Sequence, residues 1–590
     1  MTRLGRIARS PFFLVIGTIT IWFTVAFLVW PNIAVITAAF APDGHISFDA
    51  FDKIASSERV QRSLFNSGML AATLAVSTNI VGVFIVLVTS YFRVRGARLL
   101  WFGYATTFIY GGVVLASGYR AIYGRGGIVT GWLQGFLPAL PEDWFSGFPA
   151  VLITMTLATT TNHMLFVSTA MSRIDQQSVE AAKLMGAGPW RILGTIVFPT
   201  LRPVLFAVTI LSFLTGLGAL SAPQVLGGTD FQTVAPTILT LAKSDSSRDV
   251  AMLLALILGV ATMVLLLVFA RMERGGTYYS LARVSSRLEK QQLRSSTGNT
   301  VLHVAAYGLF VLYTLPVVLI VLYSFLPTTA IVSNQVSPAD LTMANYMRVF
   351  SGNAALWPLL VSIGYSFLAA FICVLGMLFV VRMLTQHRNW VTKALEVLLH
   401  IPWVLPAALA ALGLVVAYDH ATPILGGVVL TGTAGILLVA YISVKIPFTL
   451  RLLRAAFVTL DSSLEEAARN LGASPLRILR DIVLPPVFPV AIAVFALNFN
   501  SLLDDYDLAA FLAHPLYQPL GVVIRANTSG DLNPDAISNN FVYTVLLMIV
   551  TGLVMTLVYW RPKRRTPAAR TPLVTPGTVQ APRPTQEVHA

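Results

Sequence analysis

Residues 175–193 read DQQSVEAAKLMGAGPWRIL, and residues 461–479 read DSSLEEAARNLGASPLRIL. The two stretches match at a constant offset, which indicates an internal duplication. The residues identical at matched positions in and just after them are Glu180/Glu466, Ala181/Ala467, Ala182/Ala468, Gly186/Gly472, Ala187/Ala473, Pro189/Pro475, Arg191/Arg477, Ile192/Ile478, Pro199/Pro485 and Pro203/Pro489. Chance does not explain agreement at this density, so the chain consists of two related halves.

Each copy predicts a short helix with an abrupt end. Asp175 is expected to cap the first helix, and Ser462 with Glu465 to form a capping box at the second. Gly186 and Gly472 are expected to end these helices, because glycine accepts the left-handed conformation. The proline three positions later suits the first turn of a following helix. The sequence therefore predicts a rigid, protruding helix pair in each half.

The chain is too apolar to fold as a soluble protein. Of its 590 residues, 56% are hydrophobic and only 11% are charged. Many apolar runs reach the roughly 20 residues that cross a bilayer as a helix. The predicted spans are 12–38, 63–91, 99–119, 148–170, 201–223 and 250–271 in the first half, and 301–326, 357–383, 394–418, 430–453, 487–503 and 541–560 in the second. We predict an all-α integral membrane protein with about 12 transmembrane helices, arranged as two parallel six-helix halves.

These runs divide the chain into four parts. They are a first transmembrane half (1–272), a linker (273–300), a second transmembrane half (301–562) and a tail (563–590). The linker is polar and basic. The tail is rich in Pro and Thr and has almost no large apolar residue, so we expect it to be disordered.

The net charge of +14 is concentrated in loops on one side of the predicted spans, while the opposite loops are mixed or acidic. This positive-inside pattern places both termini and the linker in the cytoplasm. It indicates a multi-pass protein of a bacterial inner or plasma membrane, with the lipid bilayer and not nucleic acid as its charged partner. The N-terminal run after Arg3, Arg6 and Arg9 is too long for a signal peptide core and is interpreted as an uncleaved span, with the cleaved form as the alternative.

The duplicated stretch resembles the EAA loop of binding-protein-dependent ABC importer permeases, the MetI-like or type I importer family. The resemblance covers roughly residues 60–270 and 355–560. It implies that each helix pair sits in a cleft of an ATPase subunit. The paired alanines are themselves expected to keep one helical face nearly flat, so that another protein can approach closely. By this resemblance, the coupling residues are Glu180, Ala181, Ala182, Gly186, Glu466, Ala467, Ala468 and Gly472.

No Gly-Lys pair occurs in the sequence, so a phosphate-binding Gly-x-x-x-x-Gly-Lys loop is excluded. The chain is therefore not expected to be an enzyme, and ATP would be used by a partner. The resemblance implies two copies of a cytoplasmic ABC ATPase and an extracytoplasmic substrate-binding protein. We expect no cofactor bound by this chain.

Catalytic and metal-binding patterns are not found in the sequence. The eight histidines are scattered and Cys373 is the single cysteine. Asn162 and His163 in the fourth span are candidates for the substrate pathway, with an interhelical hydrogen bond as the alternative. Asn500, Asp504 and Asp505 near the outer end of the eleventh span are further candidates. With Asp507 they would suit a cationic substrate, unless they are solvated or capping groups.

The substrate is read from resemblance alone. The fusion of two six-span halves and the stretch 217–228 resemble ferric iron permeases, and fused chains are also typical of thiamine permeases. The stretch 501–506 is similar to a segment of polyamine permeases. We expect iron(III), then thiamine, polyamine or phosphonate. The alternative class is a secondary transporter of the major facilitator type, which has no use for the duplicated loop.

Overall fold

The computed structural model describes residues 11–41, 45–109, 111–273, 288–293, 295–333, 337–387, 389–528 and 535–559. Within these residues the regular elements are helices, apart from a single bridge between Phe92 and Gln291. Ten described helices are long and apolar enough to cross a membrane, or twelve spans if each of two bent helix pairs counts as one. The predicted all-α membrane fold is confirmed.

The first half consists of six spans and several short helices. The elements are α2 (Pro11–Phe23), η1 (Thr24–Val29), α3 (Trp30–Phe40), α4 (Asp49–Ser56), α5 (Glu58–Val86), η2 (Leu87–Tyr91), α6 (Ala97–Tyr104), η3 (Ala105–Phe108), α7 (Gly112–Tyr123), α8 (Ile128–Phe136), α9 (Gly147–Asn162), η4 (His163–Val167), α10 (Ser168–Met171), α11 (Gln176–Leu184), α12 (Pro189–Ile192), η5 (Leu193–Val197), α13 (Phe198–Leu217), α14 (Ser221–Leu226), α15 (Val234–Leu241), η6 (Asp245–Ser247) and α16 (Arg248–Glu273).

The second half repeats this order. Its elements are α17 (Ser296–Ser324), α18 (Thr328–Ser333), η7 (Pro338–Asp340), α19 (Ala344–Ser351), α20 (Asn353–Gln386), α21 (Trp390–Leu399), α22 (Ile401–Val404), α23 (Ala407–Tyr418), η8 (Pro423–Leu425), α24 (Ala434–Val458), α25 (Ser462–Asn470), α26 (Pro475–Ile478), η9 (Leu479–Val483), α27 (Leu484–Leu503), α28 (Ala509–Leu512), α29 (Leu520–Thr528) and α30 (Ala536–Tyr559). Helix α17 begins inside the stretch 273–300 that the sequence assigned to the linker.

The third span of each half is broken, where the sequence predicted continuous helices over 99–119 and 394–418. The helices bend by 110° between 97–108 and 112–136, and by 111° between 390–404 and 407–418. The first break contains Gly111 and Gly112, and Gly112 has a φ of +52°. The second contains Pro406, which has no N–H to continue a helix. Hydropathy averages over such a break and cannot detect it.

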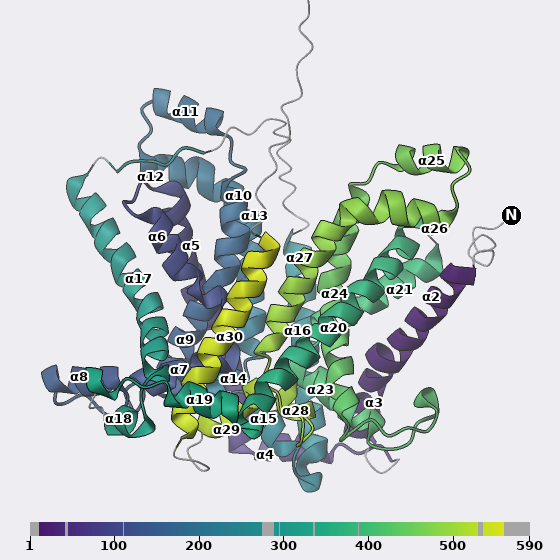
Figure 1. The fold of residues 1–590 in the computed structure, drawn as a ribbon, viewed down its shortest axis with the longest axis horizontal. Coiled ribbons are helices and arrows are strands. Elements are labelled where there is room, and N and C mark those ends of the chain that lie inside the picture. Colours follow the sequence, from purple (N-terminus) through teal and green to yellow (C-terminus); the bar gives the residue numbers. More distant parts are fainter. Residues whose placement is uncertain are drawn as a thin grey trace, which may run out of the picture.

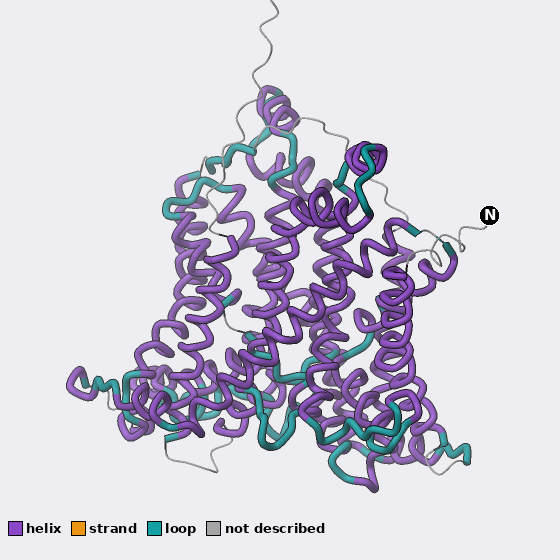
Figure 2. Tube along the Cα trace, turned by 45° about the vertical axis from the view of Figure 1, so that its right-hand side comes forward, coloured by secondary structure: helices purple, strands orange, loops and turns teal. Residues whose placement is uncertain are grey.

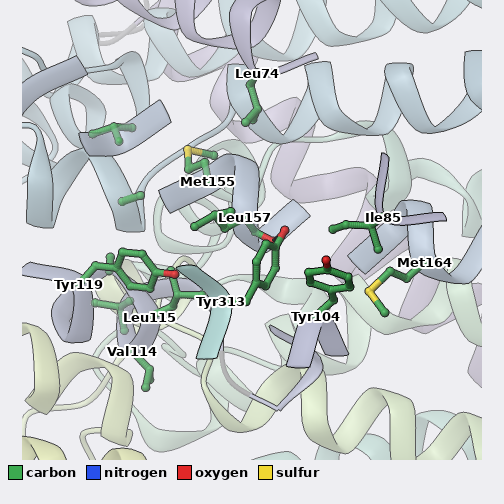
Figure 3. Close-up of a cluster of buried hydrophobic side chains, with 14 of the residues drawn as sticks. Leu74, Ile85, Tyr104, Val114, Leu115, Tyr119, Met155, Leu157, Met164 and Tyr313 are labelled. Carbon is green, nitrogen blue, oxygen red and sulfur yellow. Dashed lines mark hydrogen bonds between the residues drawn. The ribbon is translucent and has the colours of Figure 1, made fainter. Parts of the chain in front are cut away.

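The two halves interlock through their first spans. In the first half, α5 packs against α9 and α13, and in the second half α20 packs against α24 and α27. Helix α3 packs against α16 of its own half and α23 of the other, and α17 packs against α30 and against α6 of the other half. Figure 3 shows Tyr104 of α6 beside Tyr313 of α17, with ring centroids 5.4 Å apart. Tyr313 also forms a 2.6 Å hydrogen bond with Thr160 of α9.

Helices α11 and α25 project from the same side of the molecule, at the top of Figure 1 and again in Figure 2. We call this side the coupling face. Helix α2 begins and α30 ends towards it, while α4 and α29 lie towards the opposite face (Figure 1). Arg3, Arg6, Arg9, residues 274–287 and the tail 563–590 lie outside the described residues.

A glycine allows two helix backbones of the first half to approach closely. A Cβ atom added to Gly216 of α13 would lie 2.7 Å from the Cα atom of Ala71 and 3.3 Å from the carbonyl oxygen of Leu70, both in α5. These obstacles are backbone atoms, which cannot rotate away. Small residues of this kind let helix backbones approach in a membrane.

We predict that Gly216→Ala destabilises the protein by about 1–3 kcal/mol, the usual range for overpacking, because α13 must move away from α5. Thermal unfolding of the purified protein in detergent measures the effect. Gly68→Ala in α5 is the matched control, since nothing lies within 4 Å of a Cβ atom there. Equal unfolding temperatures for the two variants would contradict the proposed close contact.

Candidate functional site

The duplicated loops form two nearly identical helix pairs, α11–α12 and α25–α26. Gly186 and Gly472 have φ values of +83° and +81°, as predicted. In the first pair, Gly186 N donates to Lys183 O and Ala187 N to Ala182 O, both at 2.9 Å. The second pair repeats this pattern at 3.0 Å, from Gly472 to Arg469 and from Ala473 to Ala468. This is the Schellman motif, which satisfies the last carbonyl groups of a helix.

The N-cap predicted from the sequence is confirmed at α11 but not at α25. Asp175 caps α11 by accepting from Gln177 N at 3.1 Å, as predicted. The predicted Ser462/Glu465 capping box is wrong. Asp461 is the N-cap residue of α25 and accepts from Ser463 N at 2.9 Å, and hydrogen bonds from Ser463 hold its pKa below its usual value. Glu465 pairs with an arginine instead.

The coupling helices expose large apolar side chains at their ends. Leu184 and Met185 are 90% and 82% exposed, and Leu471 is 89% exposed. Sequence reasoning missed these residues, although Met185 and Leu471 occupy matched positions directly before the two glycines. Such exposure in water is unfavourable, so these tips are expected to meet another surface.

The paired alanines do not form the flat outer face that their small side chains predicted. Ala181 and Ala467 are exposed, but Ala182 is buried and Ala468 is half-buried. Consecutive helical residues point about 100° apart, and here the second alanine of each pair turns towards the protein while the first stays on the exposed side. Glu180 and Glu466 are exposed on the outer surface.

The linker holds the first coupling helix. Gln291 N donates to Tyr91 O at 2.7 Å, and Arg93 N donates to Gln291 O at 2.9 Å, which fixes the linker beside η2. Glu289 N then donates to the side chain of Gln176 at 2.9 Å, and this side chain in turn donates to Glu180 at 3.0 Å. Gln176 is the first residue of α11 and is only 4% exposed, so the linker reaches the base of the helix.

An ion pair holds the second coupling helix. Arg382, near the end of α20, donates two hydrogen bonds to Glu465 in the first turn of α25, at 2.8 and 2.5 Å. The side chains are 9% and 15% exposed, so water screens this pair weakly. Val179 occupies the position of Glu465 in the first half and is buried. The two copies therefore share their shape but are anchored by different contacts.

A cavity of about 370 Å³ lies between the two halves. Gly112 at the start of α7 and Pro406 with Ala407 at the start of α23 line it, so both broken spans open onto it. Thr154, Thr159, Thr215 and Ser221 contribute hydroxyl groups from the first half, and Asp507 a carboxylate from the second. Trp403 lines both this cavity and a second one of about 640 Å³, which Glu396, Arg451 and Arg454 also line.

A row of hydrogen bonds joins the halves beyond α13 and α27. We call it the seam. It runs from Gly111 N to Asp504 (3.0 Å), from Ser221 to Asp507 (2.5 Å), from Tyr506 to Gln224 (2.7 Å), from Arg525 to Gln224 O (3.2 Å) and from Thr528 to Ser117 (3.1 Å).

The hydrogen bond between Ser221 and Asp507 joins equivalent positions of the two repeats. Ser221 and Asp507 are 286 positions apart, the same offset that separates Glu180 from Glu466. They are therefore equivalent residues of the two repeats in direct contact, which places them at the axis about which the halves are related. The sequence already grouped Asp507 with Asp504 and Asp505, but its contact with Ser221 is visible only in the fold.

The two pathway candidates of the fourth span lie outside the cavity. His163 is fully buried, packs against Gly82 and lies 3.3 Å from Asn79 Oδ1 in α5. It makes the interhelical contact named as the alternative, and neither it nor Asn162 lines the cavity.

The candidates near the outer end of the eleventh span, Asn500, Asp504 and Asp505, do not line the cavity themselves. The buried amide of Asn500 has no hydrogen-bond partner. Asp504 belongs to the seam, and Asp505 accepts from Leu508 N and Ala509 N at 3.3 Å at the start of α28. Asp505 thus acts as the capping group that the sequence left as an alternative, and Asp507 alone of the three acids lines the cavity.

The chain is similar to known transport proteins along most of its length. It is 38% identical over 569 residues, 96% of this chain and 99% of the other, to a Sinorhizobium fredii protein named "Probable ABC transporter permease protein y4fN". It is 23% identical to the ferric transport system permease protein FbpB of Actinobacillus pleuropneumoniae, covering 82% of this chain and 69% of the other. A Salmonella typhimurium protein named as a 2-aminoethylphosphonate transport system permease, PhnU, is 24% identical over 39% of this chain and 81% of its own length.

The family profile matches the chain twice, in agreement with the duplicated helix pairs and the two interlocked halves. The profile described as "Binding-protein-dependent transport system inner membrane component" matches residues 3–274 and 374–564, one match in each half. The relatives are transport subunits and not enzymes. The chain belongs to the family of binding-protein-dependent ABC importer permeases.

Proposed function

We propose that this permease carries iron(III) across the membrane. The similarity to FbpB, which is named as a ferric transport permease, extends over 82% of the chain and supports this choice. Among the described residues, no three His, Cys, Asp or Glu side chains lie close enough to share a metal ion. The ion would therefore be selected and delivered by a substrate-binding protein, and would only pass through this chain.

The coupling face is proposed to be cytoplasmic and to dock two copies of an ATPase. Each copy would receive one helix pair, and the exposed tips at Leu184, Met185 and Leu471 would be buried in its cleft. ATP is used by these subunits. The binding protein would dock on the opposite face, where the loops after the seam are located. Membership of the permease family removes the secondary carrier as an alternative.

The proposed transport mechanism rests on the cavity and the seam, which both lie between the halves. The seam joins the halves on the side of the cavity away from the coupling loops. When ATP draws the two ATPase subunits together, α11 and α25 approach each other and the halves rotate as rigid bodies. We infer that the seam then opens and admits the ion to the cavity.

A second candidate substrate is 2-aminoethylphosphonate. PhnU, which is named for it, is 24% identical to this chain, but the match covers only 39% of it. Thiamine and polyamines rest on resemblances of sequence alone and rank below it.

We predict ATP-dependent accumulation of radiolabelled iron(III) in membrane vesicles that contain this chain, the ATPase encoded beside it and its binding protein. The measurement is retained radioactivity with and without ATP. Accumulation of 2-aminoethylphosphonate in place of iron would select the second candidate. Uptake that a proton gradient drives without the ATPase would contradict the importer mechanism.

The different anchors of the coupling helices predict separable effects. Arg382→Leu leaves the partly buried Glu465 unpaired, at a cost of up to about 3–5 kcal/mol, and should loosen α25. Gln176→Ala removes the linker contact and should loosen α11. Hydrogen exchange of the backbone amides measures both, and we expect at least a tenfold faster exchange confined to the affected helix.

Each variant serves as the control for the other, and the charge swap Arg382→Glu with Glu465→Arg should restore slow exchange in α25. Equal changes in α11 and α25 in either single variant would show that the anchors are not independent.

The seam predicts a cross-link that stops transport. Ser117 and Thr528 come from opposite halves, and their hydroxyl groups are 3.1 Å apart. In a Cys373→Ser background, Ser117→Cys with Thr528→Cys should form a disulfide on oxidation. ATP-dependent uptake should then be lost and should return with dithiothreitol. Full uptake by the oxidised, cross-linked protein would refute opening of the seam.

A further inference from the structure

The cavity between the halves has one strongly charged point. Among the described residues that line it, Asp507 is the only one with an ionisable acid or base in its side chain. The other polar side chains of the lining are hydroxyls and the indole of Trp403. The neighbouring acids are engaged elsewhere, because Asp504 accepts from Gly111 N and Asp505 caps α28.

A hydroxyl group in the wall of the cavity lacks a hydrogen-bond partner. The hydroxyl of Thr154 in α9 is buried and has no hydrogen-bond partner. It lines the same cavity as Asp507. A buried hydroxyl without a partner costs about 1–3 kcal/mol. A solute in the cavity that offers it a hydrogen bond would remove this cost.

The remaining features decide the sign of the charge that the cavity prefers. The first residues of α7 and α23, Gly112 and Ala407, also line it, and each helix N-terminus carries about half a positive charge. Asp507 supplies the only full charge among the described lining residues, so a group that touches its carboxylate directly meets a negative charge. Trp403 adds an aromatic side chain to the wall, which also attracts cations.

We propose that the cavity binds a small solute through a positively charged group placed at Asp507. This inference rests on the proposed transport function but not on the choice of iron, since a metal cation and an ammonium group both satisfy it. Asp507 lies in the seam as well as in the cavity, so it meets the solute as the halves separate. Its hydrogen bond from Ser221 then gives way to the cationic group.

The test compares variants at Asp507 in vesicles that contain the complete transporter. Asp507→Asn keeps the shape and the hydrogen-bonding capacity but removes the charge, and should lower uptake at least tenfold. Asp507→Glu should restore part of it. The control is Asp481→Asn, which removes an exposed carboxylate of η9 outside the cavity, the seam and the two coupling helix pairs, and should leave uptake unchanged. The amount of inserted protein and its unfolding temperature are compared for all variants.

The probes are iron(III), putrescine, 2-aminoethylphosphonate and ethylphosphonate, which lacks the ammonium group. We expect wild-type accumulation of at least one of the first three, and none of ethylphosphonate. Equal uptake by wild type and Asp507→Asn, accumulation of ethylphosphonate, or accumulation of no probe would each overturn the inference. Dependence on ATP is measured in the same vesicles, so that failure of the proposed function appears as wild-type uptake without ATP.

Discussion

Within a lipid bilayer, each backbone N–H and C=O group needs a partner inside the protein, and this requirement governs the centre of the molecule. The third span of each half is broken, so backbone groups near Gly111 and Pro406 lose their helical partners. At the first break, the carboxylate of Asp504 from the other half accepts from Gly111 N. The break in one half is thus completed by the other, and the two halves cannot be understood as separate bundles. The cavity forms where these breaks meet.

The duplication gives the two halves the same frame but not the same chemistry. Both coupling helices end in a Schellman motif, because both copies keep the glycine at the matched position. The positions inside the frame differ. Ser221 faces Asp507, and the buried Val179 corresponds to Glu465, which an arginine holds. A single polypeptide allows such differences, since each half folds only beside its fixed partner. The same fusion supplies the linker that holds α11 at Gln176.

The spans and the ends of the coupling helices could be predicted from the sequence, because the signals for them are local. Hydropathy indicated the spans, and the duplicated glycines indicated where the coupling helices end. Prediction from the sequence failed where a side chain that could have served its own helix is paired with a residue far away in the chain. Glu465 has the spacing of a capping box, but Arg382, 83 positions earlier, pairs with it. The acids after the eleventh span showed the same limit. Their clustering was visible, but only the fold separates Asp504 and Asp505, which satisfy backbone groups, from Asp507, which lines the cavity.

The contacts between the halves also explain how the molecule can move without unfolding. Where α3 meets α23 and α17 meets α6, the contacts include buried apolar and aromatic side chains, which keep their packing only if the helices move together. The seam is polar instead. A hydrogen bond contributes only about 0.5–1.5 kcal/mol net, because water replaces the lost partner when the bond opens. The seam can therefore be broken and remade in each cycle, while the interlocked first spans keep the halves together. An apolar seam of the same extent would expose its surface to water at each opening and would hold the cavity closed.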